Sequence, residues 1–440
     1  MNFAGFSLVG WRRTIWFGIA VVAATTGILS SRASAQSLDS VALFQETLQS
    51  DFFGVDARAM GMGNTGLTTS HDASAIIYNP ANLARVRRIE FRGGLSHLRT
   101  SNDTRMTSGS QAYDDGRDLT KTRINALSLT MPVPAYRGSL VFGFGLHRVN
   151  SFDRSTGLLY PPPAGYNSDR ARELETGGIW KWTVAGALDI SPRLSVGLST
   201  HLLTGSDAYR WNRVVKGDSP SQTITENQSI DIDYAGVSAT AGVTYAVSHA
   251  LTAGLSVETP TWTQAEERHS LILDTASSSF EWVLNDGTAN YTLTRPFSFG
   301  IGLSGEFNRL TLAGDVHYSD WSQLDIKYDD ASLNNTPELQ FIQDNLKETV
   351  GWNLGAEYLF PAQGINFRAG YFSDPLPIDS RFIESQRKYL TFGLGLLIDR
   401  VMALDLAYVH GGYKLRDTDP GNSFAEYKTR RVFVTFGYRI

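Results

Sequence analysis

The feature that most constrains the fold of this chain is an alternation of apolar and polar residues that continues from residue 88 to the C-terminus. The clearest case is residues 431–440, whose apolar set is Val432, Val434, Phe436, Tyr438 and Ile440. A period of two is typical of a β-strand with one polar and one apolar face. The sequence therefore predicts an all-β, antiparallel fold with about fourteen strands.

The connections between these segments also follow a pattern, because short turns and long polar loops alternate strictly. The short turns are expected at 134–137, 191–192, 248–249, 306–307, 361–363 and 399–400, and the long loops at 100–121, 151–176, 205–231, 260–290, 321–348, 374–387 and 412–429. Short periplasmic turns and long extracellular loops are typical of an up-and-down transmembrane β-barrel. A soluble β-sandwich has no reason to separate its loops by length. The stretch 264–275 either extends the seventh strand or forms another hairpin.

Composition supports the barrel and excludes other classes. Among 440 residues there are 23 Phe, 18 Tyr, 9 Trp and 41 Gly, and only 19% are charged. So many aromatic residues exclude a disordered chain, and a pI of 5.9 does not suit a nucleic-acid-binding protein. No apolar run of about 20 residues follows residue 30, which excludes a bundle of membrane helices.

Nothing in the sequence suggests an enzyme. There is no Cys, no G-x-S-x-G, no H-E-x-x-H and no phosphate-binding loop, and the 8 His show no metal-ligand spacing. We therefore expect no catalytic residues, no metal and no cofactor.

The N-terminus has the form of an export signal. Arg12 and Arg13 precede an uncharged run, Thr14–Leu29, and Ala33-Ser34-Ala35 supplies small residues for cleavage before Gln36. The alternative is a retained membrane anchor. A signal peptide over 1–35 predicts that the mature protein leaves the cytoplasm.

Residues 36–87 do not alternate and differ in character from the strands, which are expected over 88–440. Asp72 is a candidate N-cap for a short helix over 73–78, and Pro80 is expected to begin another through Leu83. About 50 residues are too few for an independent domain. Inside a barrel they would form a hatch that plugs the lumen; the alternative is a periplasmic tail.

These residues also carry a resemblance to a known family. The segments 56–63 (DARAMGMG), 72–75 (DASA) and 78–84 (YNPANLA) resemble the start of outer-membrane transport proteins of the FadL and TodX type. Three later segments fit the family order: 258–262 resembles the loop after its seventh strand, 315–323 its ninth strand, and 367–377 its eleventh strand and loop. The resemblance implies a fourteen-stranded barrel with an N-terminal hatch, in agreement with the strand count above.

The resemblance implies passive uptake of hydrophobic compounds, such as long-chain fatty acids or hydrocarbons, across the bacterial outer membrane. In the family the Asn-Pro-Ala element, here Asn79, Pro80 and Ala81, lies beside a kink in the third strand, through which cargo leaves sideways into lipid. Gly143 and Gly145 are the residues expected to permit that bulge. The alternative is that these glycines only make room for the hatch.

Charged residues of the hatch and the first strand are candidates for its anchor. Asp72, Arg58, Glu90 and Arg92 are expected to anchor the hatch by ion pairs, unless all four are ordinary solvated lumen charges.

The outer loops are expected to hold a capture surface for hydrophobic compounds. Loop 205–231 contains Trp211, Val214 and Val215, and loop 260–290 contains Trp262 and Trp282. Exposed apolar groups of this size either bind a partner or pack against one another. Loop 321–348 is also expected to contain a helix that is capped by Thr336, starts at Pro337 and has an apolar face formed by Leu339, Ile342 and Leu346.

The expected partners are hydrophobic small molecules, outer-membrane lipid and the barrel-assembly machinery; no nucleic acid is expected, and the protein is expected to be a monomer. Residues 56–59 also resemble the start of PorV-type barrels of the type IX secretion system, so a secretion component that binds secreted proteins is the alternative function. A general diffusion porin is a third option, which a plugged lumen disfavours.

Overall fold

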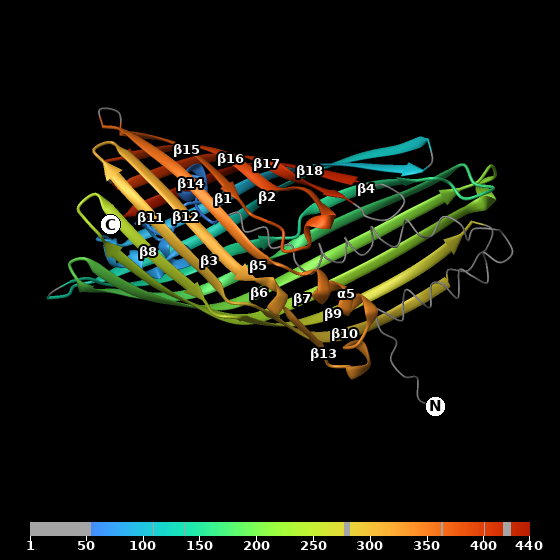
Figure 1. Ribbon diagram of the computed structural model, residues 1–440, viewed down its shortest axis with the longest axis horizontal. Coiled ribbons are helices and arrows are strands. Elements are labelled where there is room, and N and C mark those ends of the chain that lie inside the picture. The colour runs from blue at the N-terminus through green and yellow to red at the C-terminus, as the bar shows by residue number, and fades with distance from the viewer. Residues whose placement is uncertain are drawn as a thin grey trace.

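The chain forms a closed antiparallel β-barrel (Figure 1). The structure, a computed structural model, describes residues 54–440 except 109, 137, 277–281, 362–363, 400 and 417–423. The first strand pairs with the last over Glu90↔Arg439 to Arg105↔Phe424, which closes the sheet. The predicted signal peptide lies outside the described residues. Among the residues that are described, no helix is long and apolar enough to cross a membrane.

The eighteen strand segments of the described chain form fourteen strands, because four strands are each interrupted once; the predicted number is confirmed. The segments are β1 (Glu90–Ser108), β2 (Gln111–Val133), β3 (Leu140–Ser151), β4 (Arg154–Tyr160), β5 (Ser168–Ser191), β6 (Leu194–Lys216), β7 (Thr223–Ala246), β8 (Leu251–Glu258), β9 (Thr261–Thr275), β10 (Trp282–Arg295), β11 (Ser298–Phe307), β12 (Leu310–Asp320), β13 (Asp325–Tyr328), β14 (Glu348–Phe360), β15 (Ile365–Ser373), β16 (Ile383–Ile398), β17 (Met402–Arg416) and β18 (Phe424–Arg439). The interrupted strands are β3–β4, β8–β9, β10–β11 and β12–β13. The short helices are α3 (Ala57–Gly61), α4 (Ala75–Tyr78), η2 (Pro80–Arg85), η3 (Pro220–Gln222), η4 (Trp321–Gln323), η5 (Ala331–Leu333), α5 (Pro337–Asn345) and η6 (Ser380–Phe382).

Several predicted loops are strands instead. Residues 100–121, 205–231 and 260–290 lie largely in β1, β2, β6, β7, β9 and β10, and 264–275 extends the seventh strand. β5 and β7 each have 24 residues, whereas about 9–11 residues cross a membrane. Their outer halves therefore stand clear of the bilayer, where both faces contact polar surroundings and the apolar period disappears. Cross-strand ion pairs such as Arg210–Asp231 (2.7 Å) join this outer region.

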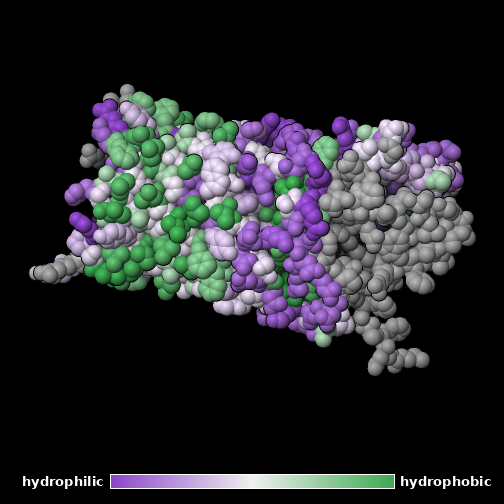
Figure 2. Space-filling model, viewed as in Figure 1, coloured by the Kyte–Doolittle hydropathy of each residue, from purple (hydrophilic) through white to green (hydrophobic). Residues whose placement is uncertain are grey.

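The apolar strand face is turned outward and forms a belt around the barrel. Figure 2 shows apolar side chains gathered on the half of the barrel that carries the C-terminus, with a polar band beyond them. Trp182, Leu202, Val237 and Trp262 are about half exposed and stand in one register row across four strands. Trp at this boundary is typical of the membrane interface, so the row marks the outer edge of the belt.

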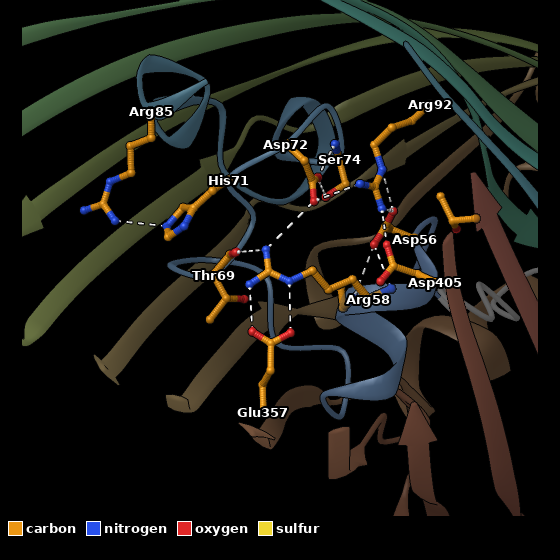
Figure 3. Close-up of polar contacts among 12 residues, drawn as sticks. Asp56, Arg58, Thr69, His71, Asp72, Ser74, Arg85, Arg92, Glu357 and Asp405 are labelled. Atoms are coloured by element: carbon orange, nitrogen blue, oxygen red, sulfur yellow. Dashed lines mark hydrogen bonds and ion pairs between the residues drawn. The ribbon is translucent and has the colours of Figure 1, made fainter. Parts of the chain in front are cut away.

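The hatch, defined here as residues 54–86, lies inside the barrel at the end that carries the C-terminus (Figures 1 and 3). Its backbone presses against glycines of the wall. A Cβ at Gly242, Gly355 or Gly370 would lie 2.0–2.1 Å from an atom of the hatch. These wall positions leave no room for a side chain, so glycine is needed there for the hatch to pack against the wall.

Wall side chains also satisfy polar backbone groups of the hatch. Asp315 Oδ2 accepts from Gly66 N (2.8 Å) and Leu67 N (3.1 Å), and Thr391 Oγ1 accepts from Gly63 N (2.9 Å). Buried backbone groups need such partners, so irregular backbone is stable within the lumen.

The loops at the outer end pack into a cap. The predicted helix is confirmed as α5, with Thr336 Oγ1 accepting from Leu339 N (3.4 Å). Leu339, Ile342 and Leu346 are buried in one cluster with residues of neighbouring loops and strands. Loop–loop packing therefore accounts for the apolar face of this helix.

The close contact between the hatch and Gly355 predicts that Gly355→Val dislodges the hatch. The new side chain would overlap the Met62 carbonyl oxygen, which lies 2.1 Å from the ideal Cβ position. We expect trypsin to cleave at Arg58 and Arg85 several-fold faster than in the wild type. The measurement is limited proteolysis of folded protein, with heat-modifiable gel migration to verify that the barrel is intact.

Gly186→Val is the matched control, since a Cβ there comes no closer than 3.7 Å to Phe142. Equal cleavage rates in the Gly355 variant and the wild type would contradict the claim that the hatch needs glycine at this wall position.

Candidate functional site

A buried ionic network anchors the hatch to the wall (Figure 3). Arg92 on β1 contacts four carboxylates: Asp56 (2.6 Å), Asp405 (3.1 Å), Glu90 (3.2 Å) and Asp72 (3.4 Å). Two of these carboxylates belong to the hatch and two to the wall, so one guanidinium joins both. The prediction that Asp72, Glu90 and Arg92 take part in ion pairs that anchor the hatch is confirmed.

The network continues to the opposite wall. Arg58 of the hatch pairs with Glu357 (3.2 Å), and Arg368 bridges Glu357 (2.6 Å) and Asp405 (2.7 Å). Burial alone would raise the pKa of Asp72, but Arg92 and Arg58 hold it below its ordinary value. Asp72 therefore stays charged and keeps the hatch paired.

The Asn79-Pro80-Ala81 turn packs against β6 and β7, not the third strand. Asn79 Nδ2 donates to Val243 O (3.3 Å), and a Cβ at Gly197 would lie 2.4 Å from Pro80 C. The hatch residues that face the third strand are Ile76 and Leu83. The turn caps η2, because Asn79 Oδ1 accepts from Ala81 N (3.1 Å).

The expected bulge at Gly143 and Gly145 is wrong. Residues 140–147 pair without interruption with β2 on one side and β5 on the other. A Cβ at Gly143 would lie 2.8 Å from Ile76, and one at Gly145 2.2 Å from the His147 ring. Gly143 therefore makes room for the hatch, which was the alternative prediction, whereas Gly145 makes room for a side chain of its own strand, His147.

The third strand does separate from its neighbour β2, but only beyond His147. β2–β3 pairing ends at Ala126↔His147, and no strand pairing joins residues 111–125 to β3 or β4. A bulge follows between Arg148 and Asn150, and the strand pairing of β4 within the described chain is with β5. We call this interruption, between 111–125 and 148–160, the wall gap.

Side chains rather than backbone bonds cross the wall gap. Arg123 on β2 contacts Asp153 through both carboxylate oxygens (2.8 and 3.3 Å), and Arg148 contacts the same carboxylate at 3.1 Å. The gap begins next to Leu146, which is in register with Leu127 and with Trp182 of the outer apolar row. It therefore starts at the outer edge of the belt.

A cavity of about 290 Å³ lies in the lumen above the hatch. Asn64, Leu67, Ile77 and Tyr78 line it from the hatch side. Apolar side chains from the wall include Leu203, Trp321 and Phe372, and Val149 and Asn150 line it beside the wall gap. The cavity thus combines apolar surface with polar groups and adjoins the gap.

The residues predicted for outer capture loops lie in strands and do not converge. Trp211, Val214 and Val215 are on β6, where Trp211 packs against Met106, Leu158 and Tyr160. Trp262 on β9 and Trp282 on β10 are about half exposed. The prediction of loops is therefore wrong, whereas a role in capture stays a prediction.

Sequence reasoning missed the wall gap, although the loop expected at 151–176 begins within it, and it missed one cavity residue, Arg295. Asn150, Ser151 and Asp153 are turn-forming residue types that follow the apolar run of the third strand, which is a recognisable signal for a strand break. Pro296 is a second such signal, because proline has no N–H to donate to a sheet.

The sequence matches a family of known proteins. Residues 49–417 match the family described as outer membrane protein transport protein (OMPP1/FadL/TodX). No curated protein matches the chain.

Solved structures have the same fold. The Pseudomonas putida toluene transporter TodX is 16% identical (TM-score 0.63), covering 89% of this chain and 99% of its own. A Pseudomonas aeruginosa FadL homologue is 14% identical (TM-score 0.62), with 87% and 98% covered. The CymD monoaromatic hydrocarbon channel is 15% identical (TM-score 0.58), with 89% and 99% covered. Because the family match extends over most of the chain and the barrel has the same fold, this protein belongs to the FadL/TodX family of outer-membrane transport proteins.

Proposed function

We propose that the protein lets hydrophobic compounds, such as long-chain fatty acids or aromatic hydrocarbons, cross the outer membrane by passive diffusion, and that they leave sideways through the wall gap. The observation that carries this proposal is the loss of β2–β3 pairing beyond His147, next to the lumenal cavity. Titles of related structures, a toluene transporter and a monoaromatic hydrocarbon channel, support a hydrophobic cargo.

A sideways exit suits the distribution of apolar surface. The hatch fills the lumen below the cavity, whereas the outer face beside the gap has a hollow of about 820 Å³. Leu127, Leu146 and Trp182 are among the residues that line this hollow. Transfer of a hydrocarbon chain from water to lipid releases about 0.8 kcal/mol per buried CH₂, so release into the membrane needs no other energy source.

The gap can be tested by a covalent cross-link. Arg123 and Asp153 face each other across it, and the chain has no Cys, so Arg123→Cys with Asp153→Cys gives one defined thiol pair. We expect a short cross-linker with two thiol-reactive groups, such as a bis-maleimide, to lower uptake of a labelled long-chain fatty acid or hydrocarbon several-fold, because it closes the exit. The measurement is uptake by cells before and after cross-linking.

Leu394→Cys with Leu406→Cys is the control, since these residues face each other on two other wall strands, β16 and β17, that are already paired there. Unchanged uptake after complete cross-linking of the gap would place the exit elsewhere. No uptake of any apolar compound by the wild type would instead favour the PorV-type secretion component.

The hatch is expected to block the axial path to ions and small polar solutes. Arg92→Met would leave its four carboxylate partners without their shared cation, and loss of one buried partner costs about 3–5 kcal/mol. We expect the hatch to loosen and ion conductance in planar bilayers to rise several-fold above the wild type.

Arg268→Gln is the control because its ion pair with Asp233 is exposed. Heat-modifiable migration verifies that the Arg92 variant folds. Wild-type conductance from a folded Arg92 variant would show that this network does not hold the plug.

A further inference from the structure

Basic side chains gather on the outside of the barrel, on four neighbouring strands, β16, β17, β18 and β1 (Figure 1). On each of these strands the run of apolar, outward-facing side chains ends at the outer edge of the belt, and the next outward-facing residue is basic. The pairs are Leu390 and Lys388, Tyr408 and His410, Val432 and Arg430, and Leu95 and His97. Arg99 and Lys428 follow on the same face of β1 and β18. We call Lys388, His410, Arg430, His97, Arg99 and Lys428 the basic edge.

The apolar belt ends differently on other strands. The corresponding residues are Thr204 on β6, Ala235 on β7, Gln264 on β9, Asp320 on β12 and Glu348 on β14. These residues are neutral or acidic, and the whole chain has a net charge of −5. Among the strands compared, basic charge at the membrane edge therefore lies in one sector of the wall, whereas general interface anchors would be spread around it.

The strand register brings like charges of the basic edge together. Arg99 lies directly opposite Arg430 across β1 and β18, and Arg430 lies opposite His410 on β17. Side chains in such positions have Cβ atoms about 5 Å apart, and like charges there are destabilising. An anion bound between the two guanidinium groups would remove that repulsion.

Carboxylates of the protein neutralise only part of this charge. Arg99 has a carboxylate partner at 2.7 Å, and Lys428 has two, at 3.0 and 3.1 Å. Arg430 and Lys388 are exposed, and within the part of the chain that the structure describes no carboxylate oxygen lies within 4.0 Å of either cation. Both side chains therefore have donors available for a ligand where the apolar belt gives way to water.

The wall below the basic edge indicates where such a ligand comes from. The strand pairs β16–β17, β17–β18 and β18–β1 are continuous over Lys388–Ile398, Met402–Arg416 and Glu90–Arg105. Because this part of the wall has no break in its pairing, a ligand reaches the basic edge from the membrane and not from the lumen. Apolar side chains below the edge, such as Phe392 and Phe436, are about half exposed and offer a surface for hydrocarbon chains.

The chemistry of the basic edge suits phosphate. A guanidinium binds phosphate through paired hydrogen bonds, and an ammonium group binds it as a point charge. Lys388 and Lys428 stand in the next register row outward, on either side of Gly412, which has no side chain to fill the space between them. The edge therefore offers two neighbouring positions for phosphate groups, one between the arginines and one between the lysines.

We infer that the basic edge binds a phosphorylated lipid of the outer leaflet, with a phosphate between Arg99 and Arg430 and the acyl chains on the apolar face of β16, β17, β18 and β1. The ligand is a lipid of the membrane and not the cargo. The site lies on the outside of the wall, so it is independent of the proposed transport function.

The test is native mass spectrometry of the purified full-length protein, titrated in detergent with diphosphoryl lipid A or with dioleoylglycerol, which has acyl chains but no phosphate. The wild type is expected to bind lipid A more tightly. Arg430→Gln with Lys388→Gln should weaken lipid A binding about tenfold or more, because each basic residue near an anionic lipid contributes to the attraction. Arg430→Lys with Lys388→Arg, which keeps both charges, should recover much of the loss.

Arg210→Gln with Arg268→Gln is the matched control. It removes the same charge from exposed ion pairs on the outer face of β6 and β9, so it should bind lipid A like the wild type. Heat-modifiable migration verifies that each variant folds.

Unchanged lipid A binding after loss of Arg430 and Lys388, or an equal loss in the control, would overturn the site. Equal binding of lipid A and dioleoylglycerol to the wild type would show that phosphate is not recognised. Inorganic phosphate that bound as tightly as lipid A would also overturn the inference, because the acyl chains would then contribute nothing.

Discussion

The fold depends on the rule that every backbone N–H and C=O must be hydrogen-bonded in the hydrocarbon of a membrane. β1 meets that rule by pairing with both β2 and β18, so the barrel has no free edge. The departure on the third strand begins only beyond His147, next to the outer edge of the apolar belt. Arg123 and Asp153 supply side-chain contacts where backbone bonds are missing, so a gap is compatible with a stable wall.

The same rule explains the hatch, whose irregular backbone would be costly anywhere but in a protein-lined lumen. Wall groups such as Asp315 and Thr391 satisfy its N–H groups, and wall glycines such as Gly355 allow the close approach that these bonds require. Arg92 and Arg368 then link hatch and wall carboxylates in one network. The hatch therefore fills the axial path through the barrel. The wall gap lies beside the cavity that remains.

Whether a segment could be predicted from the sequence depends on whether one of its faces contacts lipid. Where one strand face meets lipid, as at Val432 and Phe436, the period of two predicted strands correctly. Beyond the membrane both faces are polar, so the outer parts of β5–β7 resembled loops. Ion pairing between hatch and wall could be predicted because Asp72 and Arg92 are opposite charges in the hatch and the first strand. The roles of Gly143 and Gly145 depend on Ile76 and His147, contacts that no local pattern encodes.

The central claim, that cargo leaves sideways through the wall gap, is tested most directly by locating an apolar solute in the protein. A structure determined with 1-bromododecane, in which anomalous scattering marks the bromine, would reveal its path. If cargo leaves through the wall gap, bromine sites are expected in the lumenal cavity and between residues 111–125 and 148–160. Bromine sites that run along the barrel axis past a displaced hatch, with none at the wall gap, would contradict it.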